Sequence, residues 1–319
     1  MACLGIEIGG TKLQSAIVNG AGAILIRRAD RVDPAAGAAV LREALAVQLA
    51  RIVLDWKARG DDPLLAAGIG FGGPVDRQRG VIAASFHVSG WNGFPLAEWV
   101  SGVIGGLPTV LENDSNAAAL AEATVGAGSG RRLVFYSNAG SGIGAGFVID
   151  GGLYRGRGAG EMELGHLRLT PDGGILEDVA AGWAIDRRAC EEAAAHPQGA
   201  VAALAGGHAA TARHVATAAT AGDATASAIL DDAARHYAWA LSHAVHLLNP
   251  DVIVLGGGVA EIGAAWRDRV AGHIDSLLMA ALRPAPEVRL AALGQDVVPV
   301  GAALAATLAA AQTPRISRS

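Results

Sequence analysis

The sequence opens with a glycine turn directly after an apolar stretch. Residues 4–8 are strand-like, and Gly9-Gly10-Thr11-Lys12 follows them. Glycines let backbone N–H groups approach a phosphate closely, and the Thr11 hydroxyl adds a donor. An ordinary hairpin turn would show the same glycines. Glu7 favours the phosphate interpretation, because a carboxylate inside a strand is costly unless it lines a cleft or holds a hydrated Mg²⁺.

Two further glycine clusters follow strand-like segments. Gly140-Ser141-Gly142 comes after residues 133–136, and its serine and successive amides predict an anion nest, unless the segment is simply a flexible loop. Gly256-Gly257-Gly258 ends the apolar run 251–255, at the carboxyl end of a predicted strand, where α/β sheets bind ligands. Three small residues there would let a nucleotide base and ribose lie flat.

One glycine pattern is a lookalike. Gly68, Gly70 and Gly73 fit G-x-G-x-x-G, but Pro74 follows where a helix should begin. No ribose-binding acid appears about 20 residues further on. We therefore regard this dinucleotide fingerprint as chance. The P-loop pattern G-x-x-x-x-G-K-[ST] does not occur either.

The segment Asn113-Asp114-Ser115-Asn116 carries the best acid-base candidate. Asp114 lies at a predicted strand-to-helix junction, where a carboxylate can point into a cleft beside a helix N-terminus. Helix capping is the other common use of an aspartate at such a place. The flanking amides of Asn113 and Asn116 favour a site.

Several histidines need separate interpretation. Glu163 and His166, three residues apart around Gly165, predict either contacts to sugar hydroxyls or half of a metal site. His243 and His246 also lie three apart, in a predicted apolar helix without acidic or cysteine partners. We interpret this second pair as structural.

Composition limits what these residues can do. The chain has 319 residues, of which 51% are hydrophobic and 4% aromatic, which excludes a disordered chain and suggests two domains. A net charge of −5 predicts no nucleic-acid partner. Two cysteines and the absence of a leader before residue 4 favour the cytoplasm. The apolar stretch 297–311 falls short of a membrane span and predicts a buried helix.

Strand-like runs alternate with alanine-rich helical segments, as in an α/β protein. Residues 4–18 and 133–149 each read as a strand, a glycine turn and a strand, which suggests a duplicated domain with a cleft between the halves. Residues 35–59 predict a helix, and residues 180–248 are mostly helical, with a loop or short helix in 205–224.

Taken in order, these motifs resemble the ROK family of bacterial sugar kinases and repressors, within the actin-like ATPase superfamily. Glu7 to Lys12 is similar to the family's first phosphate motif, D-I-G-G-T-K, with glutamate in place of aspartate. Residues 70–76 match the sugar-side segment, and residues 113–116 match N-D-x-N. Residues 140–144 match the second phosphate motif, and residues 163–166 match E-x-G-H. Residues 249–258 match the adenosine motif. The resemblance spans nearly the whole chain.

The resemblance implies two ribonuclease-H-like domains with a cleft between them. We expect the small domain to comprise residues 1–114 plus 302–319, and the large one residues 115–301. It also implies an ATP- and Mg²⁺-dependent hexose kinase, in which Asp114 is the catalytic base. The implied sugar-binding residues are Gly73, Asn113, Glu163, His166 and Glu177. Mg·ATP would lie against Gly9, Gly10, Thr11, Lys12, Gly140, Ser141, Gly142 and Gly256 to Gly258, with Glu7 holding Mg²⁺ through water.

The sequence departs from the family pattern in two places. Members commonly carry a C-x-C-G-x-x-G-C zinc loop between the histidine of E-x-G-H and the next glutamate, but here residues 167–176 intervene without a cysteine. We expect no zinc, and a tight turn at residues 170–174 stiffened by Pro171. His87 and its neighbours also differ from the usual sugar-side pattern.

The function expected from these observations is phosphorylation of a hexose, most simply the 6-hydroxyl of glucose or a related hexose or hexosamine. The alternatives are a sugar-responsive regulator or pseudokinase that binds its ligand without transfer, and an actin-like ATPase acting on protein partners. We expect no membrane partner and a homodimer. The first phosphate motif begins too early in this sequence for a winged helix to precede it, and Asp114 is present, so we favour the enzyme.

Overall fold

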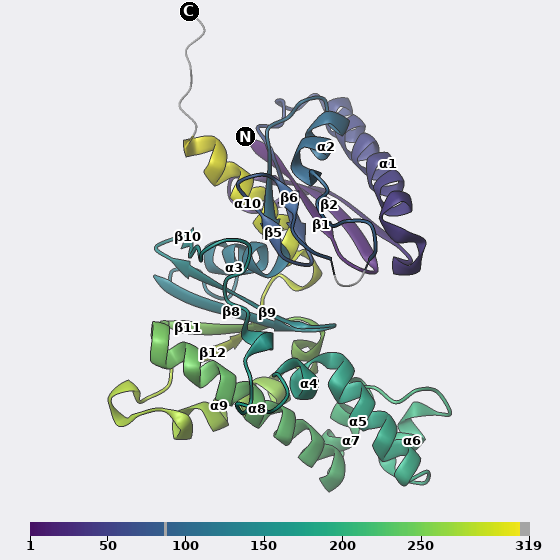
Figure 1. Cartoon of the computed structure of the whole chain (residues 1–319), viewed down its shortest axis with the longest axis vertical. Helices are drawn as coiled ribbons and strands as arrows, with labels where there is room; N and C mark the ends of the chain where they lie inside the picture. The colour runs from purple at the N-terminus through teal and green to yellow at the C-terminus, as the bar shows by residue number, and fades with distance from the viewer. Residues whose placement is uncertain (86–87, 313–319) are drawn as a thin grey trace, which may run out of the picture. The chain divides into compact units, whose positions relative to one another are not determined.

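The computed structural model describes residues 1–85 and 88–312, so His87 lies outside the described residues. The chain separates into two compact units (Figure 1). The first takes in residues 1–130, 146–161 and the chain from residue 293, and the second takes in residues 131–145 and 162–292. The domain boundaries and the cleft expected from the sequence stay predictions.

The first unit is built on a five-stranded sheet with the order β3-β2-β1-β4-β7. Its strands are β1 (Ala2–Ile8), β2 (Lys12–Asn19), β3 (Ile24–Arg31), β4 (Ala67–Phe71) and β7 (Thr109–Asn113). The β1, β2 and β3 strands form an antiparallel meander, whereas β1, β4 and β7 are parallel. The strands predicted on both sides of the first glycine turn are therefore confirmed. Beside the sheet lies a short hairpin of β5 (Val75–Asp76) and β6 (Val81–Ile82).

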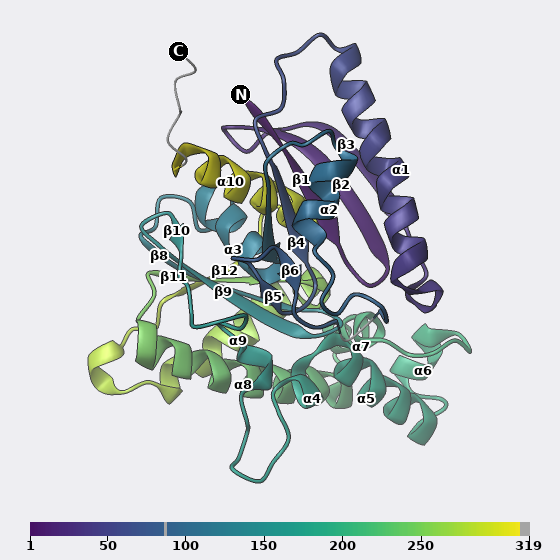
Figure 2. The same cartoon turned by 45° about the horizontal axis from the view of Figure 1, so that its top comes forward.

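Helices lie on both sides of this sheet, as Figure 2 shows for α1 (Gly37–Ala58) and α10 (Val297–Gln312). The α1 helix confirms the helix predicted at 35–59. It buries Leu41, Leu45, Leu49, Ile52 and Trp56, a stripe at helical spacing that packs into the core of the unit. The unit is completed by α2 (Leu96–Val103) and α3 (Asp114–Thr124).

The α10 helix packs against β1 and β4 at backbone contact, because glycines face it. A Cβ on Gly5 would lie 1.8 Å from the Pro299 carbonyl oxygen, and one on Gly68 would lie 1.8 Å from the Ala302 carbonyl oxygen. The lookalike glycine Gly68 therefore serves helix packing. By length and composition Gly294–Gln312 could cross a membrane, a longer apolar stretch than expected, but its buried face belongs to this core.

The second sheet has the order β10-β9-β8-β11-β12. Its strands are β8 (Leu133–Ala139), β9 (Ile143–Ile149), β10 (Gly152–Leu153), β11 (Val252–Gly256) and β12 (Glu287–Leu290). The β8, β11 and β12 strands are parallel, and the division between the units falls within β9. The strands predicted around the second glycine turn are confirmed.

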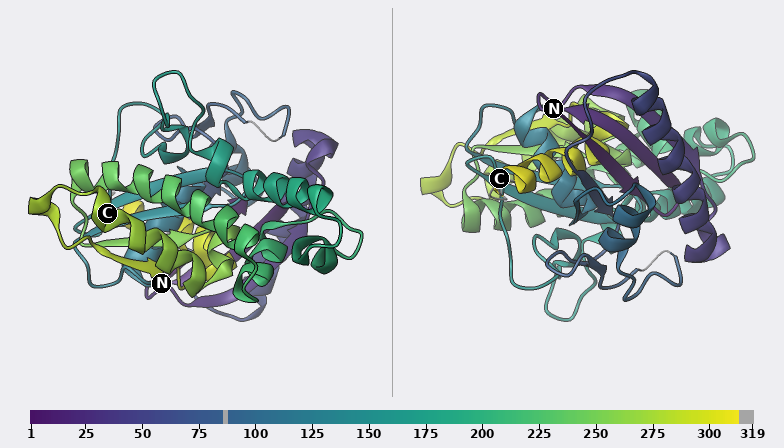
Figure 3. Two further views of the ribbon diagram at one scale, coloured as in Figure 1. Left: turned by 90° about the horizontal axis from the view of Figure 1, so that it is seen from below. Right: turned by 90° about the horizontal axis from the view of Figure 1, so that it is seen from above.

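The helices of the second unit confirm the helical segment predicted at 180–248. They are α4 (Glu177–Ala180), α5 (Gly182–Ala195), α6 (Ala200–Ala205), α7 (Ala212–Thr220), α8 (Ala224–Leu248) and α9 (Ala264–Leu277). The α8 and α9 helices run side by side (Figure 3). Short 3-10 turns lie at Leu164–His166, Gly258–Ile262 and Ala280–Leu282.

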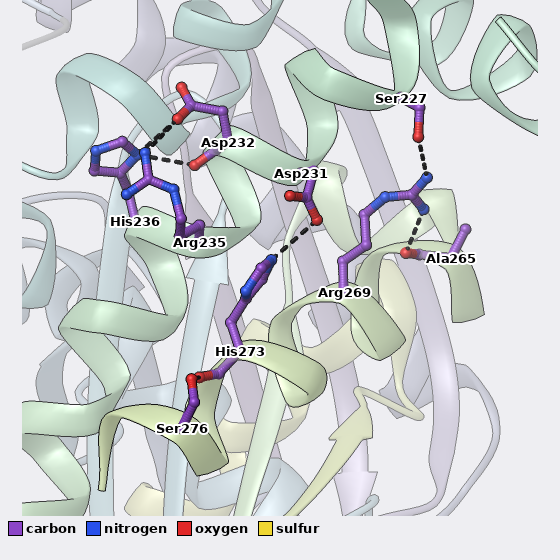
Figure 4. A network of polar contacts seen from close by, with 9 residues as sticks. All are labelled: Ser227, Asp231, Asp232, Arg235, His236, Ala265, Arg269, His273 and Ser276. Carbon is purple, nitrogen blue, oxygen red and sulfur yellow. Dashed lines mark hydrogen bonds and ion pairs between the residues drawn. The ribbon is translucent and has the colours of Figure 1, made fainter. Parts of the chain in front are cut away.

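Polar contacts join α8 to α9 along this pair (Figure 4). His273 Nε2 lies 2.9 Å from an Asp231 carboxylate oxygen, and Arg269 donates to the Ser227 hydroxyl at 3.2 Å. Further along α8, the His246 Nδ1 lies 2.7 Å from the Ser242 carbonyl oxygen, and the His243 ring packs edge-on against Trp239. These contacts support a structural role for both histidines, but the buried His243 Nε2 has no hydrogen-bond partner among the described residues.

The close approach of α10 predicts a large difference between two glycine substitutions. Gly68→Ala would force α10 away from β4, so we expect a loss of about 2 to 4 kcal/mol in the free energy of unfolding. Gly102→Ala, in α2 with open space around it, is the control and should gain up to about 0.5 kcal/mol. Urea unfolding of both variants measures the difference. Equal stabilities would contradict this packing.

Candidate active site

The first glycine turn is closed by a backbone bond and an ion pair. The Gly9 N–H donates to the Lys12 carbonyl oxygen at 2.9 Å. Lys12 Nζ lies 2.8 Å from Glu7 Oε2 and donates to the Gln295 carbonyl oxygen at 3.3 Å. Thr11 is exposed at the tip. The two charged residues predicted on either side of the turn are thus brought together.

Glu7 lies in an unfavourable electrostatic environment. Burial raises its pKa above the ordinary value of 4.5, and the ammonium group of Lys12 only partly opposes this. The carboxylates of Asp114 and Asp296 raise the pKa further. Sequence reasoning missed Asp296, because it precedes α10 at the far end of the chain and no motif marks it. The Asp296 carboxylate pairs with Arg27 Nε at 2.9 Å and accepts from the side-chain amide of Gln14.

Asp114 is the first residue of α3, but Asn113 is the cap of that helix. The Asn113 side-chain oxygen accepts from the backbone N–H groups of Ser115, at 2.9 Å, and Asn116, at 3.2 Å. Asp114 Oδ1 also accepts from the Ser115 N–H at 2.7 Å. Its Oδ2 lies against Gly72, where a Cβ would approach it to 3.4 Å. Asn113 therefore occupies the capping position, and Asp114 adds a second bond to the first turn through Oδ1 while its Oδ2 faces Gly72.

Asn113 also holds the segment that carries Gly73. Its Nδ2 donates to the Gly73 carbonyl oxygen at 3.2 Å. Gly73 has a φ of 155°, and a Cβ there would lie 2.8 Å from the Ala84 carbonyl oxygen, so the position needs glycine. Two residues that the resemblance assigns to sugar binding are therefore in direct contact.

The second unit brings its two glycine clusters together. Gly140-Ser141-Gly142 and Gly256-Gly257-Gly258 follow β8 and β11, which are neighbouring parallel strands. A Cβ on Gly257, whose φ is 81°, would lie 2.4 Å from the Ala139 carbonyl oxygen. The Gly140 carbonyl oxygen accepts from the Gly182 N–H, at 2.8 Å, at the start of α5. At this edge of the sheet, backbone segments lie close together with no side chains between them, as a nucleotide site requires.

Glu177 contacts the second glycine turn directly. Its Oε1 accepts from the Ile143 N–H at 2.8 Å, and a Cβ on Gly142 would lie 2.9 Å from the same oxygen. Gly165, between Glu163 and His166, also packs against Glu177. Glu163 and His166 flank this contact and are exposed, with the His166 N–H donating to the Glu163 carbonyl oxygen at 3.1 Å.

Residues 167–176 form a short hairpin. The Leu169 N–H donates to the Gly174 carbonyl oxygen at 3.0 Å, and the Leu176 N–H to the Leu167 carbonyl oxygen at 3.0 Å. The Gly173 N–H closes the turn by donating to the Thr170 carbonyl oxygen at 3.1 Å. The tight turn predicted at 170–174 is confirmed, and backbone bonds hold this segment between His166 and Glu177.

The donor chemistry around Glu7 fits Mg²⁺, which prefers oxygen ligands and keeps several waters. In residues 1–85 and 88–312, no three His, Cys, Asp or Glu side chains lie close enough to hold a metal ion directly. The carboxylates of Asp114 and Asp296 nevertheless each act electrostatically on Glu7. Such a group suits a cation bound through water.

The fold and these glycine turns define a sugar kinase built from two actin-like ATPase domains. The model of the ROK family matches residues 3–309, so the chain belongs to the ROK family. The glucokinase of Streptomyces coelicolor is 33% identical over 313 residues, which cover 94% of this chain and 96% of that protein. The glucokinase of Halalkalibacterium halodurans is 30% identical over 93% of this chain and 92% of that protein.

Solved structures agree with this assignment. The ROK family glucokinase of Streptomyces griseus, in complex with glucose and AMPPNP, has a TM-score of 0.82 at 32% identity and covers 97% of this chain and 100% of its own. The ROK hexokinase of Thermus thermophilus has a TM-score of 0.81 at 31% identity, covering 98% of this chain and 100% of its own. The chain is a sugar kinase, a phosphotransferase.

The raised pKa of Glu7 predicts a pH-dependent stability difference. A carboxylate whose pKa is higher in the folded protein stabilises the fold at low pH and loses that contribution as pH rises through the folded pKa. Glu7→Gln lacks this loss, so its Tm relative to the wild type should increase as the pH rises above the ordinary glutamate pKa of 4.5. Exposed Glu43→Gln is the control. A Tm difference that stays constant with pH would contradict the environment described for Glu7.

The hairpin at 167–176 predicts a protein without structural zinc. Such a site needs about four thiolate or imidazole ligands, and this segment with its flanks supplies His166 alone. Elemental analysis of protein purified without metal-affinity steps should find zinc well below one per chain, and a chelator should leave the Tm unchanged. Stoichiometric zinc would show that ligands elsewhere replace the missing cysteines.

Proposed function

We propose that this kinase transfers the γ-phosphoryl group of ATP to a hydroxyl of a hexose, the 6-hydroxyl of glucose or of a related hexose or hexosamine. Asp114 is the general base. This proposal rests on the arrangement at the start of α3, where Asn113 caps the helix and the Asp114 carboxylate lies beside Gly72. The Streptomyces coelicolor and Streptomyces griseus relatives, both named glucokinases, support the sugar class.

In this mechanism Asp114 accepts the proton of the attacking hydroxyl as its oxygen bonds to the γ-phosphorus, and the bond to the β-γ bridging oxygen breaks to release ADP. Phosphoryl transfer has a loose transition state, so the other groups mainly align substrates and spread charge. Mg²⁺, when bound through water near Glu7, would neutralise phosphate charge.

The substrates are assigned to the residues according to their chemistry. Backbone amides at residues 9–12, 140–142 and 256–258 suit the nucleotide, and the AMPPNP complex of the Streptomyces griseus relative supports ATP as donor. Gly73, Asn113, Glu163 and His166 offer the carbonyl, amide, carboxylate and imidazole groups that bind sugar hydroxyls. Glu177 accepts from the Ile143 N–H beside the second glycine turn and packs against Gly165, between Glu163 and His166, so its substitution should affect both substrates.

A coupled ADP-release assay over a panel of hexoses and hexosamines tests the activity and names the sugar. Turnover that depends on one or a few sugars is the expected result. Tight sugar binding without ADP release would instead identify a ligand-binding regulator. ADP release that ignores every sugar would point to an ATPase with another partner.

Asp114→Asn should keep the fold and the sugar affinity but lower kcat by at least ~10², because it removes the proton acceptor. Steady-state kinetics and sugar binding by calorimetry measure the two effects separately. Asp33→Asn, at the cap of a 3-10 turn at Pro34–Ala36, is the matched control and should retain wild-type kcat. A kcat near wild type in Asp114→Asn would exclude Asp114 as the base.

A further inference from the structure

Four polar side chains form a closed network behind the start of α3. Glu112, at the end of β7, accepts from the amide of Asn116 at 3.2 Å, and that amide also donates to Glu161 at 3.0 Å. Arg155 Nη1 lies 2.5 Å from Glu112 Oε2 and 3.7 Å from Glu161 Oε1. The Arg155 guanidinium therefore pairs with both carboxylates, and both also accept from the Asn116 amide.

This network fixes the backbone on both sides of Asp114. Glu112 Oε1 accepts from the backbone N–H of Asn113 at 3.1 Å as well as from the Asn116 side chain. Glu112 and Asn116 are each only 3% exposed, so their positions are set by packing and by these bonds. Asp114 lies between the two points that Glu112 holds.

The charge balance of the network depends on Arg155. Without it, the carboxylates of Glu112 and Glu161 would share one amide and have no cation between them. Glu112 is buried, and removing one partner of a buried ion pair leaves an uncompensated charge that is strongly destabilising. The carboxylate would have to move towards solvent, and the start of α3 is bonded to it.

We propose that Arg155 is a positioning residue for phosphoryl transfer and acts on Asp114 through Glu112 and Asn116. The proposal rests on the assignment of Asp114 as the base. A misplacement of about 1 Å in a reacting group can cost on the order of 10² in rate, although the substituted residue touches no substrate. Arg155 therefore acts on kcat through the position of Asp114, and it acts to a smaller degree on sugar binding through Asn113, which Glu112 also holds.

A cavity of about 400 Å³ within the first unit adjoins this network and provides a control. Glu112 and Arg155 line it, together with Arg77 and the apolar side chains of Leu120 and Leu308. Arg77 is an exposed arginine on the same wall but is not a member of the network. A substitution there removes the same charge from the same cavity without disturbing Glu112.

Arg155→Met and Arg77→Met are compared by steady-state kinetics with the sugar identified in the panel. Arg155→Met should lower kcat by about tenfold or more and change the sugar KM by a smaller factor, whereas Arg77→Met should match the wild type. Glu112→Gln in the Arg155→Met background removes the buried charge but keeps a side-chain oxygen for Asn113 and Asn116. This double variant should recover most of the lost kcat.

Hydrogen exchange gives a readout that is independent of catalysis. The backbone amides of Ser115 and Asn116 should lose protection in Arg155→Met and regain it in the double variant. If Asp114→Asn kept full activity while these amides responded as expected, the assignment of the base would be wrong and the network would stand.

Three results would overturn the proposal. Wild-type kcat in a folded Arg155→Met variant is one, and an equal loss in Arg77→Met is another. The third is failure of Glu112→Gln to restore kcat, which would show that Arg155 does not act through Glu112. If Arg155→Met alone fails to fold, the double variant carries the test, because it contains no unpaired charge at residue 112.

Discussion

The cost of burying a carboxylate organises much of this structure. Glu7 pairs with Lys12, and Glu112 pairs with Arg155. Glu122, fully buried at the end of α3, accepts from the backbone N–H groups of Ala127 and Leu293. Each of these partners lies in or directly beside an irregular segment: Lys12 follows the first glycine turn, Arg155 follows β10, and Ala127 and Leu293 lie in a turn and a bend. Because an unpaired carboxylate would be expensive inside the protein, these bonds fix the irregular segments that regular secondary structure leaves undefined.

The second glycine turn and the segment 163–166 of the second unit are joined by the same kind of bond. Glu177 accepts from the Ile143 N–H beside one glycine turn and packs against Gly165 beside the other segment. A backbone hairpin at residues 167–176 lies in the chain between His166 and Glu177. Hydrogen bonds of the backbone and of one carboxylate therefore hold these segments in place.

Local patterns predicted the fold and much of the site. The strands around both glycine turns, the helices at 37–58 and 182–248, and the turn at 170–174 follow from apolar periodicity and from glycine and proline chemistry. What escaped prediction depends on distant pairings. Asp296, at the other end of the sequence, acts electrostatically on Glu7, and Arg155 forms an ion pair with Glu112 on a different structural element. Gly68 looked like a chance motif because the helix it packs against lies near the C-terminus.

The place of α10 also determines when the first unit can be completed during synthesis. The ribosome makes β1, β4 and α3 early, then the whole second unit, and only afterwards the helix that packs on Gly5 and Gly68. Until then this face of the sheet lacks its cover, and the nascent chain exposes apolar surface for as long as about 170 further residues take to emerge, roughly 9 to 34 seconds at typical elongation rates. The last segment translated is therefore the one that seals the first domain, so premature termination anywhere in the second unit yields a chain with an open core and a need for chaperones.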